Sequence, residues 1–310
     1  FTKRGGQIII AVERQELITR FLELLRIKHW LKNVFVLAPL FFSGQLSDPA
    51  ARLHAALAFF AFSFAAGATY IFNDLVDLRA DRNHPVKRMR ALAAGRVRPL
   101  AAWIFLALPL ALAILACLLV APSRGLGLLA AVIAYLALNV FYSLAGKNII
   151  ILDAFCIALG FVLRIIGGCE AIGVRPSSWI LVTTFFLSLF LGFGKRRNEI
   201  LLLGEDGPGH RKVLDSYKVP FLDQLIAVTG AIAILSYSLY TLDADVVEQF
   251  GTDKLIYTIP FVVFGIFRYM FHIKKDEEGD PTEVVTRDKG LAGAIILWIL
   301  AVIAVIYGGR

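Results

Sequence analysis

A group of polar residues at the end of a long apolar run is the part of the sequence best suited to chemistry. The group consists of Asn73, Asp74, Asp77 and Asp81. At about 100° per helical residue, all four lie on one arc of a single helix. Carboxylates held this close repel one another, so the spacing predicts a divalent cation. The alternative is a solvated acidic helix end, but acidic groups at the end of a membrane span are costly and usually functional.

A second polar cluster, of opposite dominant charge, follows another apolar run. It reads Gly194-Lys-Arg-Arg-Asn-Glu199, and Lys195, Arg196 and Glu199 repeat the relative spacing of Asn73, Asp74 and Asp77. An acidic metal site opposite a basic cluster suits a ligand that carries several phosphates. The alternative is a run of basic anchors at the inner membrane face.

Three isolated residues have less specific interpretations. Lys147, with Asp153 six residues further on, could complete a phosphate clamp. Arg164 lies deep in a span, where a structural partner such as Glu170 or a backbone carbonyl is expected. His84 precedes a proline and is interpreted as loop structure rather than as a metal ligand.

The composition indicates a polytopic membrane protein. The chain has 310 residues, of which 58% are hydrophobic and 18% charged, and its mean hydropathy is +0.72. The three cysteines lie within or at the ends of apolar runs, and their spacing predicts neither a metal site nor a disulfide framework. A net charge of +8 is explained by membrane topology and anionic lipid, and nucleic acid is not expected as a partner.

Nine apolar runs predict an all-α bundle of nine transmembrane helices. We expect them at about 31–47, 52–74, 100–121, 125–144, 149–168, 177–194, 222–242, 255–272 and 290–307. Residues 13–28 read as an amphipathic helix in the membrane interface, so the predicted organisation is an interfacial segment 1–28 and a single domain 29–310.

The distribution of basic residues predicts the orientation. Of the 32 Lys and Arg residues, 26 fall on the predicted inner side and 5 on the outer side. This bias places the N-terminus and both polar clusters in the cytoplasm, with the protein in the plasma (inner) membrane. Cytoplasmic loops 75–99, 195–221 (with Tyr217) and 273–289 could then cap the site, although solvated connectors are the alternative.

The segment Asn73-Asp-Leu-Val-Asp77-Leu-Arg-Ala-Asp81 resembles the first aspartate-rich motif of the UbiA superfamily of intramembrane prenyltransferases. The segment Arg26-x-x-x-Trp30-x-Lys32-Asn33 before the first span fits the same family. The resemblance implies a helical bundle around a central cavity that opens to the cytoplasmic side. It also implies Mg²⁺ at the first motif and substrates that enter from both lipid and cytosol.

One departure from the aromatic prenyltransferases is informative. Those enzymes carry a second aspartate motif where this chain has Lys195-Arg196, and with His84-Pro-x-Lys87-Arg88 the pattern looks like the branch that makes polyprenyl-phosphoryl-5-phosphoribose. That resemblance implies phosphoribosyl pyrophosphate as donor and a decaprenyl-like polyprenyl phosphate in the bilayer as acceptor, in a pathway such as cell-wall arabinan precursor synthesis. The residues expected at the site are Asp74, Asp77 and Lys195 (catalytic); Asn73, Asp74, Asp77 and Asp81 (metal); and Lys32, Asn33, Asn73, Asp81, Lys87, Arg88, Lys147, Arg196, Glu199 and Tyr217 (substrate).

The charge distribution favours this branch independently. Phosphoribosyl pyrophosphate presents a diphosphate and a separate 5-phosphate, and the acceptor adds a third phosphate, which suits one acidic metal site plus several cations. Two alternatives remain: transfer of a polyprenyl group from its diphosphate to an aromatic or glycerol-phosphate acceptor, and a membrane transporter or lipid-binding protein. Transporters place polar groups near the bilayer midplane, whereas most charges here lie at helix ends. The sequence leaves a homo-oligomer open.

Overall fold

The computed structural model describes residues 21–203, 217–275, 284–285 and 287–308, and within these ranges it contains helices and no strand. The longer helices are α3 (Pro49–Val76), α5 (Pro99–Leu118), α6 (Pro122–Leu144), α7 (Leu152–Ile172), α8 (Ser178–Leu203), α9 (Val219–Leu242), α11 (Ile259–Lys275) and α13 (Lys289–Tyr307). The shorter elements are the 3₁₀ helices η1 (Ile27–Leu37), η2 (Lys87–Met89), η3 (Gly146–Asn148) and η5 (Lys254–Thr258), with α2 (Ala38–Phe42), α4 (Leu78–Asn83) and α10 (Ala244–Phe250). The predicted all-α class is confirmed.

Eight helices of the described ranges are long and apolar enough to cross a membrane, and they coincide with eight of the nine predicted spans. The predicted first span, 31–47, is instead built from η1 and α2, so the count of nine continuous helices is not confirmed. A 3₁₀ helix rises about 2.0 Å per residue, so η1 and α2 together extend about 30 Å, close to the hydrocarbon thickness of a bilayer. The segment therefore has the length of a crossing without being one α-helix.

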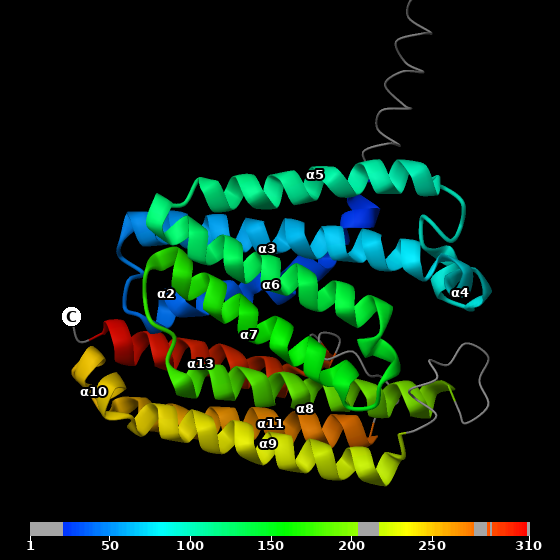
Figure 1. Ribbon diagram of the computed structural model, residues 1–310. Helices are drawn as coiled ribbons and strands as arrows, with labels where there is room; N and C mark the ends of the chain where they lie inside the picture. The colour runs from blue at the N-terminus through cyan, green and yellow to red at the C-terminus, as the bar shows by residue number, and fades with distance from the viewer. Residues whose placement is uncertain (1–20, 204–216, 276–283, 286, 309–310) are drawn as a thin grey trace, which may run out of the picture.

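Proline and aspartate residues define where several helices begin. Pro49, Pro99 and Pro122 occupy first-turn positions of α3, α5 and α6, where the missing N–H costs nothing. The side chain of Asp48 accepts a hydrogen bond from Ala50 N at the start of α3, at 2.9 Å. These signals place the helix starts at alternate ends of the bundle, so that consecutive helices run antiparallel (Figure 1).

The long helices pack in two groups that meet at α7 and α8 (Figure 1). One core joins α3, α5, α6 and α7 around Phe62, and the other joins α7, α8, α9, α11 and α13 around Phe190. Small residues let elements approach closely: a Cβ at Gly168 of α7 would lie 2.1 Å from the backbone oxygen of Val36 in η1. This contact holds η1 against α7.

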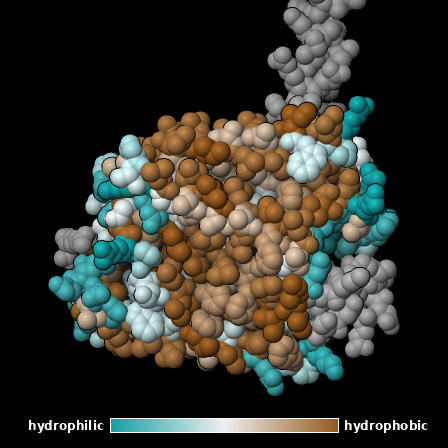
Figure 2. All heavy atoms as spheres, viewed as in Figure 1, coloured by the Kyte–Doolittle hydropathy of each residue, from teal (hydrophilic) through white to brown (hydrophobic). Residues whose placement is uncertain are grey.

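On the face shown in Figure 2, an apolar belt lies between two polar ends of the bundle. Many large apolar side chains of the long helices are exposed on this belt, as expected where lipid replaces water. The protein is thus a multi-pass membrane protein. One polar end carries α4 and the other carries α10 (Figure 1). Residues 13–20 of the predicted interfacial helix 13–28 lie outside the described residues, as do 204–216 of the predicted capping loop 195–221, and 276–283 and 286 of the loop 273–289.

Candidate active site

The acidic cluster lies at the end of the bundle that carries α4. Helix α3 ends after Val76, and after a single-residue break at Asp77 the chain continues as α4. Asp74 and Asp81 are buried, with 4% and 3% of their surface exposed, whereas Asp77 is half-buried. Buried carboxylates require compensating cations or hydrogen bonds, and the structure supplies both.

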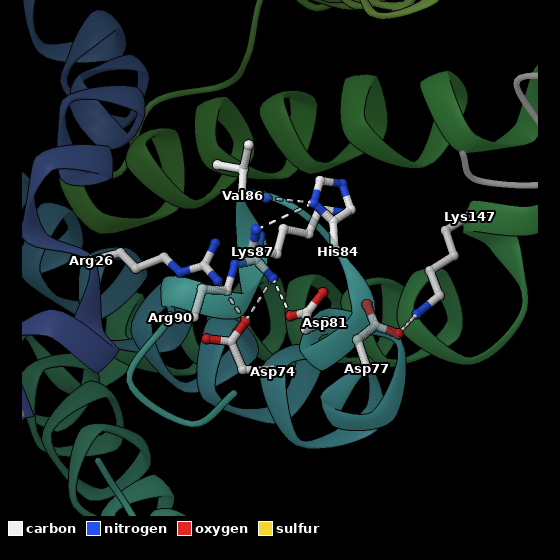
Figure 3. A network of polar contacts seen from close by, with 9 residues as sticks. All are labelled: Arg26, Asp74, Asp77, Asp81, His84, Val86, Lys87, Arg90 and Lys147. Atoms are coloured by element: carbon white, nitrogen blue, oxygen red, sulfur yellow. Dashed lines mark hydrogen bonds and ion pairs between the residues drawn. The ribbon is translucent and has the colours of Figure 1, made fainter. Parts of the chain in front are cut away.

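Asp74 and Asp81 converge on a single point. The Nη1 atom of Arg90 lies 3.1 Å from Asp74 Oδ1 and 2.6 Å from Asp81 Oδ2. The guanidinium of Arg26 contacts the same oxygen of Asp74 (Figure 3). Two carboxylates that share one nitrogen define a position at which a positive charge is favourable.

Asp77 faces a different cation. Its carboxylate pairs with the ammonium of Lys147, which lies on η3 on the far side of the cluster from Arg26 (Figure 3). The expectation that all four polar side chains share one arc assumes an unbroken helix, and the break at Asp77 turns its carboxylate away. Within the described ranges, no three His, Cys, Asp or Glu residues are grouped closely enough to hold a metal ion by themselves.

The convergent carboxylates nevertheless suit Mg²⁺. This ion prefers oxygen ligands and is usually held by one or two carboxylates together with waters and substrate phosphates, rather than by an all-protein cage. Asp74 and Asp81 meet that requirement at the position now taken by the Arg90 nitrogen. Of the predicted metal ligands Asn73, Asp74, Asp77 and Asp81, the arrangement brings Asp74 and Asp81 together, and Asn73, next to Asp74 in the chain, is half-buried.

The basic second cluster forms a buried network instead of an open cationic surface. Arg196 is 4% exposed; its Nε lies 2.7 Å from Asp153 Oδ2, and its Nη1 contacts Glu199. The hydroxyl of Tyr217 donates to Asp153 Oδ1 at 2.9 Å and accepts from Ile151 N at 2.6 Å. Burial, together with the adjacent Asp153 carboxylate, raises the pKa of Tyr217, so the hydroxyl stays protonated as a donor.

The neighbouring arginine is also used in packing. Arg197 donates from Nε to Asp223 and from Nη1 to the Ile273 oxygen, both at 2.8 Å, and thereby joins α8 to α9 and α11. Lys195 is half-buried between these networks. The predicted substrate ligands Arg196, Glu199 and Tyr217 are thus brought together, but around Asp153.

Asn33 lies inside the bundle, away from the acidic cluster. It is 1% exposed; its Nδ2 donates to Ser63 Oγ at 3.0 Å, and its Oδ1 accepts from Arg164 Nε at 2.7 Å. Arg164 also donates to the Gly160 carbonyl at 2.8 Å, so its interpretation as a structural residue with a carbonyl partner is confirmed. Lys32, next to Asn33 on η1, is half-buried.

The loop after α4 is organised by His84. Its Nδ1 accepts from the backbone N–H groups of Val86 and Lys87 at 3.1 and 3.2 Å, which confirms its interpretation as loop structure (Figure 3). On η2, Lys87 is half-buried close to the carboxylates, whereas Arg88 is exposed.

A cavity of about 480 Å³ opens beside Asp74. It is lined by Leu22, Glu23, Leu24, Arg26, Ile27, Lys28, His29, Asp74, Arg90, Ala91 and Arg96. Arg26, Arg90 and Arg96 were not among the site residues predicted from the sequence. The signal for Arg90 and Arg96 is the density of basic residues in 82–98, and Arg26 begins the Arg26-x-x-x-Trp30 segment.

Comparisons with known proteins agree with this fold. Residues 33–197 match the UbiA prenyltransferase family. The chain is 34% identical over 294 residues to the decaprenyl-phosphate phosphoribosyltransferase of Corynebacterium glutamicum, covering 91% of this chain and 85% of that protein. It is 31% identical to the protein of the same name from Mycolicibacterium smegmatis, covering 94% of each chain.

The fold is similar to that of a UbiA homologue from Archaeoglobus fulgidus solved with DMAPP and Mg²⁺. The TM-score is 0.72 at 21% identity, over 93% of this chain and 99% of that one. The family match spans more than half of the chain and includes the acidic motif, Lys147 and the second cluster as far as Arg197. The chain therefore belongs to the UbiA prenyltransferase family.

Proposed function

We propose that the protein transfers 5-phosphoribose from phosphoribosyl pyrophosphate to a polyprenyl phosphate in the membrane, with release of pyrophosphate. The observation that carries the proposal is the pair of convergent carboxylates, Asp74 and Asp81, flanked by Arg26 and Arg90 on one side and by Lys147 on the other. The names of the relatives from Corynebacterium glutamicum and Mycolicibacterium smegmatis support the same reaction.

The reaction needs no general base from the protein. An anionic oxygen of the acceptor phosphate attacks C1 of the ribose, and the bond from C1 to the diphosphate oxygen breaks as the new bond forms. Catalysis then rests on positioning and on stabilising the charge that develops on the departing diphosphate. Mg²⁺ at Asp74 and Asp81 would neutralise that charge.

The flanking cations provide the remaining compensation. Arg26 and Arg90 lie within contact of the carboxylates, so their donors can also reach phosphate oxygens bound there. Lys147 lies on the opposite side, beside Asp77, and Lys195 and Lys87 remain candidates for the ribose 5-phosphate. The charge of Arg196 is already compensated by Asp153 and Glu199, which favours a structural role for it.

The orientation follows from the substrates. Phosphoribosyl pyrophosphate is a soluble cytosolic anion, and the basic residues concentrate on the polar end with the acidic cluster. We therefore place the N-terminus and the site in the cytoplasm and the bundle in the plasma membrane.

The direct test uses purified protein in detergent with Mg²⁺, a polyprenyl monophosphate and radiolabelled phosphoribosyl pyrophosphate, followed by extraction of the lipid phase. We expect label in the lipid, loss of label with a chelator, and loss of at least 100-fold in Asp74→Asn and in Asp81→Asn, about 3 kcal/mol of transition-state stabilisation. The matched control is Asp245→Asn, an exposed aspartate on α10 at the other end of the bundle, which should retain full activity.

Prenyl transfer is the alternative within the same family. If the lipid stays unlabelled while the same preparation prenylates an aromatic acid from a polyprenyl diphosphate, the phosphoribosyl assignment is wrong. Near-normal turnover in Asp81→Asn would contradict the proposed metal position between Asp74 and Asp81.

A further inference from the structure

The cavity beside Asp74 combines apolar walls with cations, and this combination is specific to one class of ligand. Leu22, Leu24 and Ile27 contribute apolar surface, and four basic residues (Arg26, Lys28, Arg90 and Arg96) surround it. Only two acidic residues, Glu23 and Asp74, line the same cavity, so its lining carries a net positive charge. A ligand that fits it has a small anionic group attached to an apolar chain.

The cavity adjoins the acidic cluster. Its lining includes Asp74 and Arg90, so an anionic group held there is adjacent to the convergent carboxylates. Arg26 contacts Asp74 and Lys147 contacts Asp77, on opposite sides of the acidic cluster (Figure 3). Cations on two sides of the cluster can hold two different phosphates.

The apolar walls indicate whether the cavity binds a phosphate of the donor or the phosphate of the acceptor. Phosphoribosyl pyrophosphate has no apolar part and gains nothing from Leu22 or Ile27. Leu22, in the helical turn before η1, and Ile27, the first residue of η1, are each 42% exposed, and Lys28 next to Ile27 is also exposed. Apolar side chains beside cations at a membrane boundary favour an amphiphile with an anionic head group.

We infer that this cavity is the acceptor subsite, in which Lys28 and Arg96, with Arg26 and Arg90 nearer the carboxylates, bind the phosphate of a polyprenyl monophosphate while its chain leaves past Leu22 and Ile27. The inference rests on the proposed function, and it assigns the donor's 5-phosphate to the Lys147 side. Arg96 now contacts Glu23 and the Met89 oxygen, at 3.0 and 2.9 Å, on the exposed rim of the cavity.

The test measures acceptor binding without donor or metal. A C20 polyprenyl monophosphate is titrated into the detergent-purified protein and the bound fraction is followed by native mass spectrometry. The double variant Lys28→Gln/Arg96→Gln should weaken binding about tenfold, because each cation removed takes away a charge-assisted hydrogen bond at a partly exposed position. The matched control is Arg98→Gln, an exposed arginine two residues from Arg96 that does not line the cavity.

Two further arms identify the occupant. In the transfer assay, the double variant should raise the KM for polyprenyl phosphate about tenfold and leave the KM for phosphoribosyl pyrophosphate unchanged. Retention of phosphatidylglycerol should be the same in the variant and in Arg98→Gln. A rise in the donor KM instead, an equal loss of phosphatidylglycerol, or unchanged acceptor binding would each overturn the inference.

Failure of the proposed function gives a different result. If no polyprenyl phosphate is ever labelled, but the double variant still binds it more weakly, then the reaction is misassigned and the cavity is a polyprenyl-phosphate site of another activity. If labelling occurs with an unchanged acceptor KM in the double variant, the reaction stands and the subsite is elsewhere.

Discussion

Arg164 offers a quantitative test of how the bundle is held together. This cation is 6% exposed in the middle of α7, and within the described ranges it contacts no carboxylate. It donates to Asn33 on η1, to Gly160 one turn away, and to Tyr135 Oη on α6 at 3.0 Å. Its guanidinium carbon also lies 4.6 Å from the centre of the Tyr135 ring. Replacing it with methionine keeps most of its volume and removes all of these interactions.

The expected loss follows from those contacts. Hydrogen bonds between membrane helices are worth about 0.6 to 1.7 kcal/mol each, and a desolvated cation over an aromatic ring about 1 to 2 kcal/mol. The substitution also leaves the buried oxygen of Asn33 without its arginine donor. Two bonds to other helices and one ring contact together predict that Arg164→Met lowers the free energy of unfolding by about 2 to 5 kcal/mol.

The measurement is unfolding in mixed micelles, followed by circular dichroism, with Arg175→Met as the control because Arg175 is exposed in the loop before α8. Asn33→Leu should also destabilise the protein, and the double variant Asn33→Leu/Arg164→Met should lose less than the sum of the two, since neither partner is then left unpaired. If Arg164→Met unfolds like Arg175→Met, or if the two losses simply add, the network does not stabilise the fold as argued.

Three further changes have expected outcomes that follow from single contacts. Gly168→Ala should destabilise the protein by about 1 to 3 kcal/mol in the same unfolding assay, since the new Cβ would lie 2.1 Å from the η1 backbone. The control Gly293→Ala should leave the stability unchanged, because nothing lies within 4 Å of its Cβ position, and equal effects of the two variants would contradict the close packing at Gly168. Arg196→Met should lower the free energy of unfolding by about 3 to 5 kcal/mol, because the fully buried carboxylate of Asp153 on α7 loses its countercharge. A stable but inactive variant would instead indicate that Arg196 contacts the substrate directly. Hydrogen bonding by the Arg268 guanidinium holds the pKa of Asp288 well below its usual range. The ionised Asp288 carboxylate therefore stabilises the folded protein above about pH 4, and this stabilisation is lost as the pH falls further. An Asp288→Ala variant should therefore be less stable than the parent at pH 7 and approach it under acid conditions, and a difference that persists unchanged at low pH would contradict the assignment.

The sequence by itself determined the class of the protein and the identity of its acidic motif. Runs of apolar residues predict membrane helices because a helix satisfies its own backbone hydrogen bonds, so that the signal is local. The eight long helices were predicted for this reason. The spacing of Asp74, Asp77 and Asp81 is also local, although the structure ends α3 after Val76 and places Asp81 on α4.

Only the tertiary structure decided what those side chains contact. Arg26 reaches Asp74 across 48 positions in the chain, and Lys147 reaches Asp77 across 70. The identity of each cation's partner depends on how α3, η1 and η3 pack, which no local pattern encodes. The same packing places Asp153 beside Arg196, and so turned a basic motif that the sequence assigned to substrate into a buried network.

The first membrane segment shows the same division. Its apolar composition predicted a crossing, and in the structure η1 is a 3₁₀ helix that packs against α7 through the close approach at Gly168 and the hydrogen bond from Arg164 to Asn33. A 3₁₀ helix of this length is uncommon in isolation. Local sequence thus sets which segments enter the membrane, and contacts between distant segments set the shape that each adopts there.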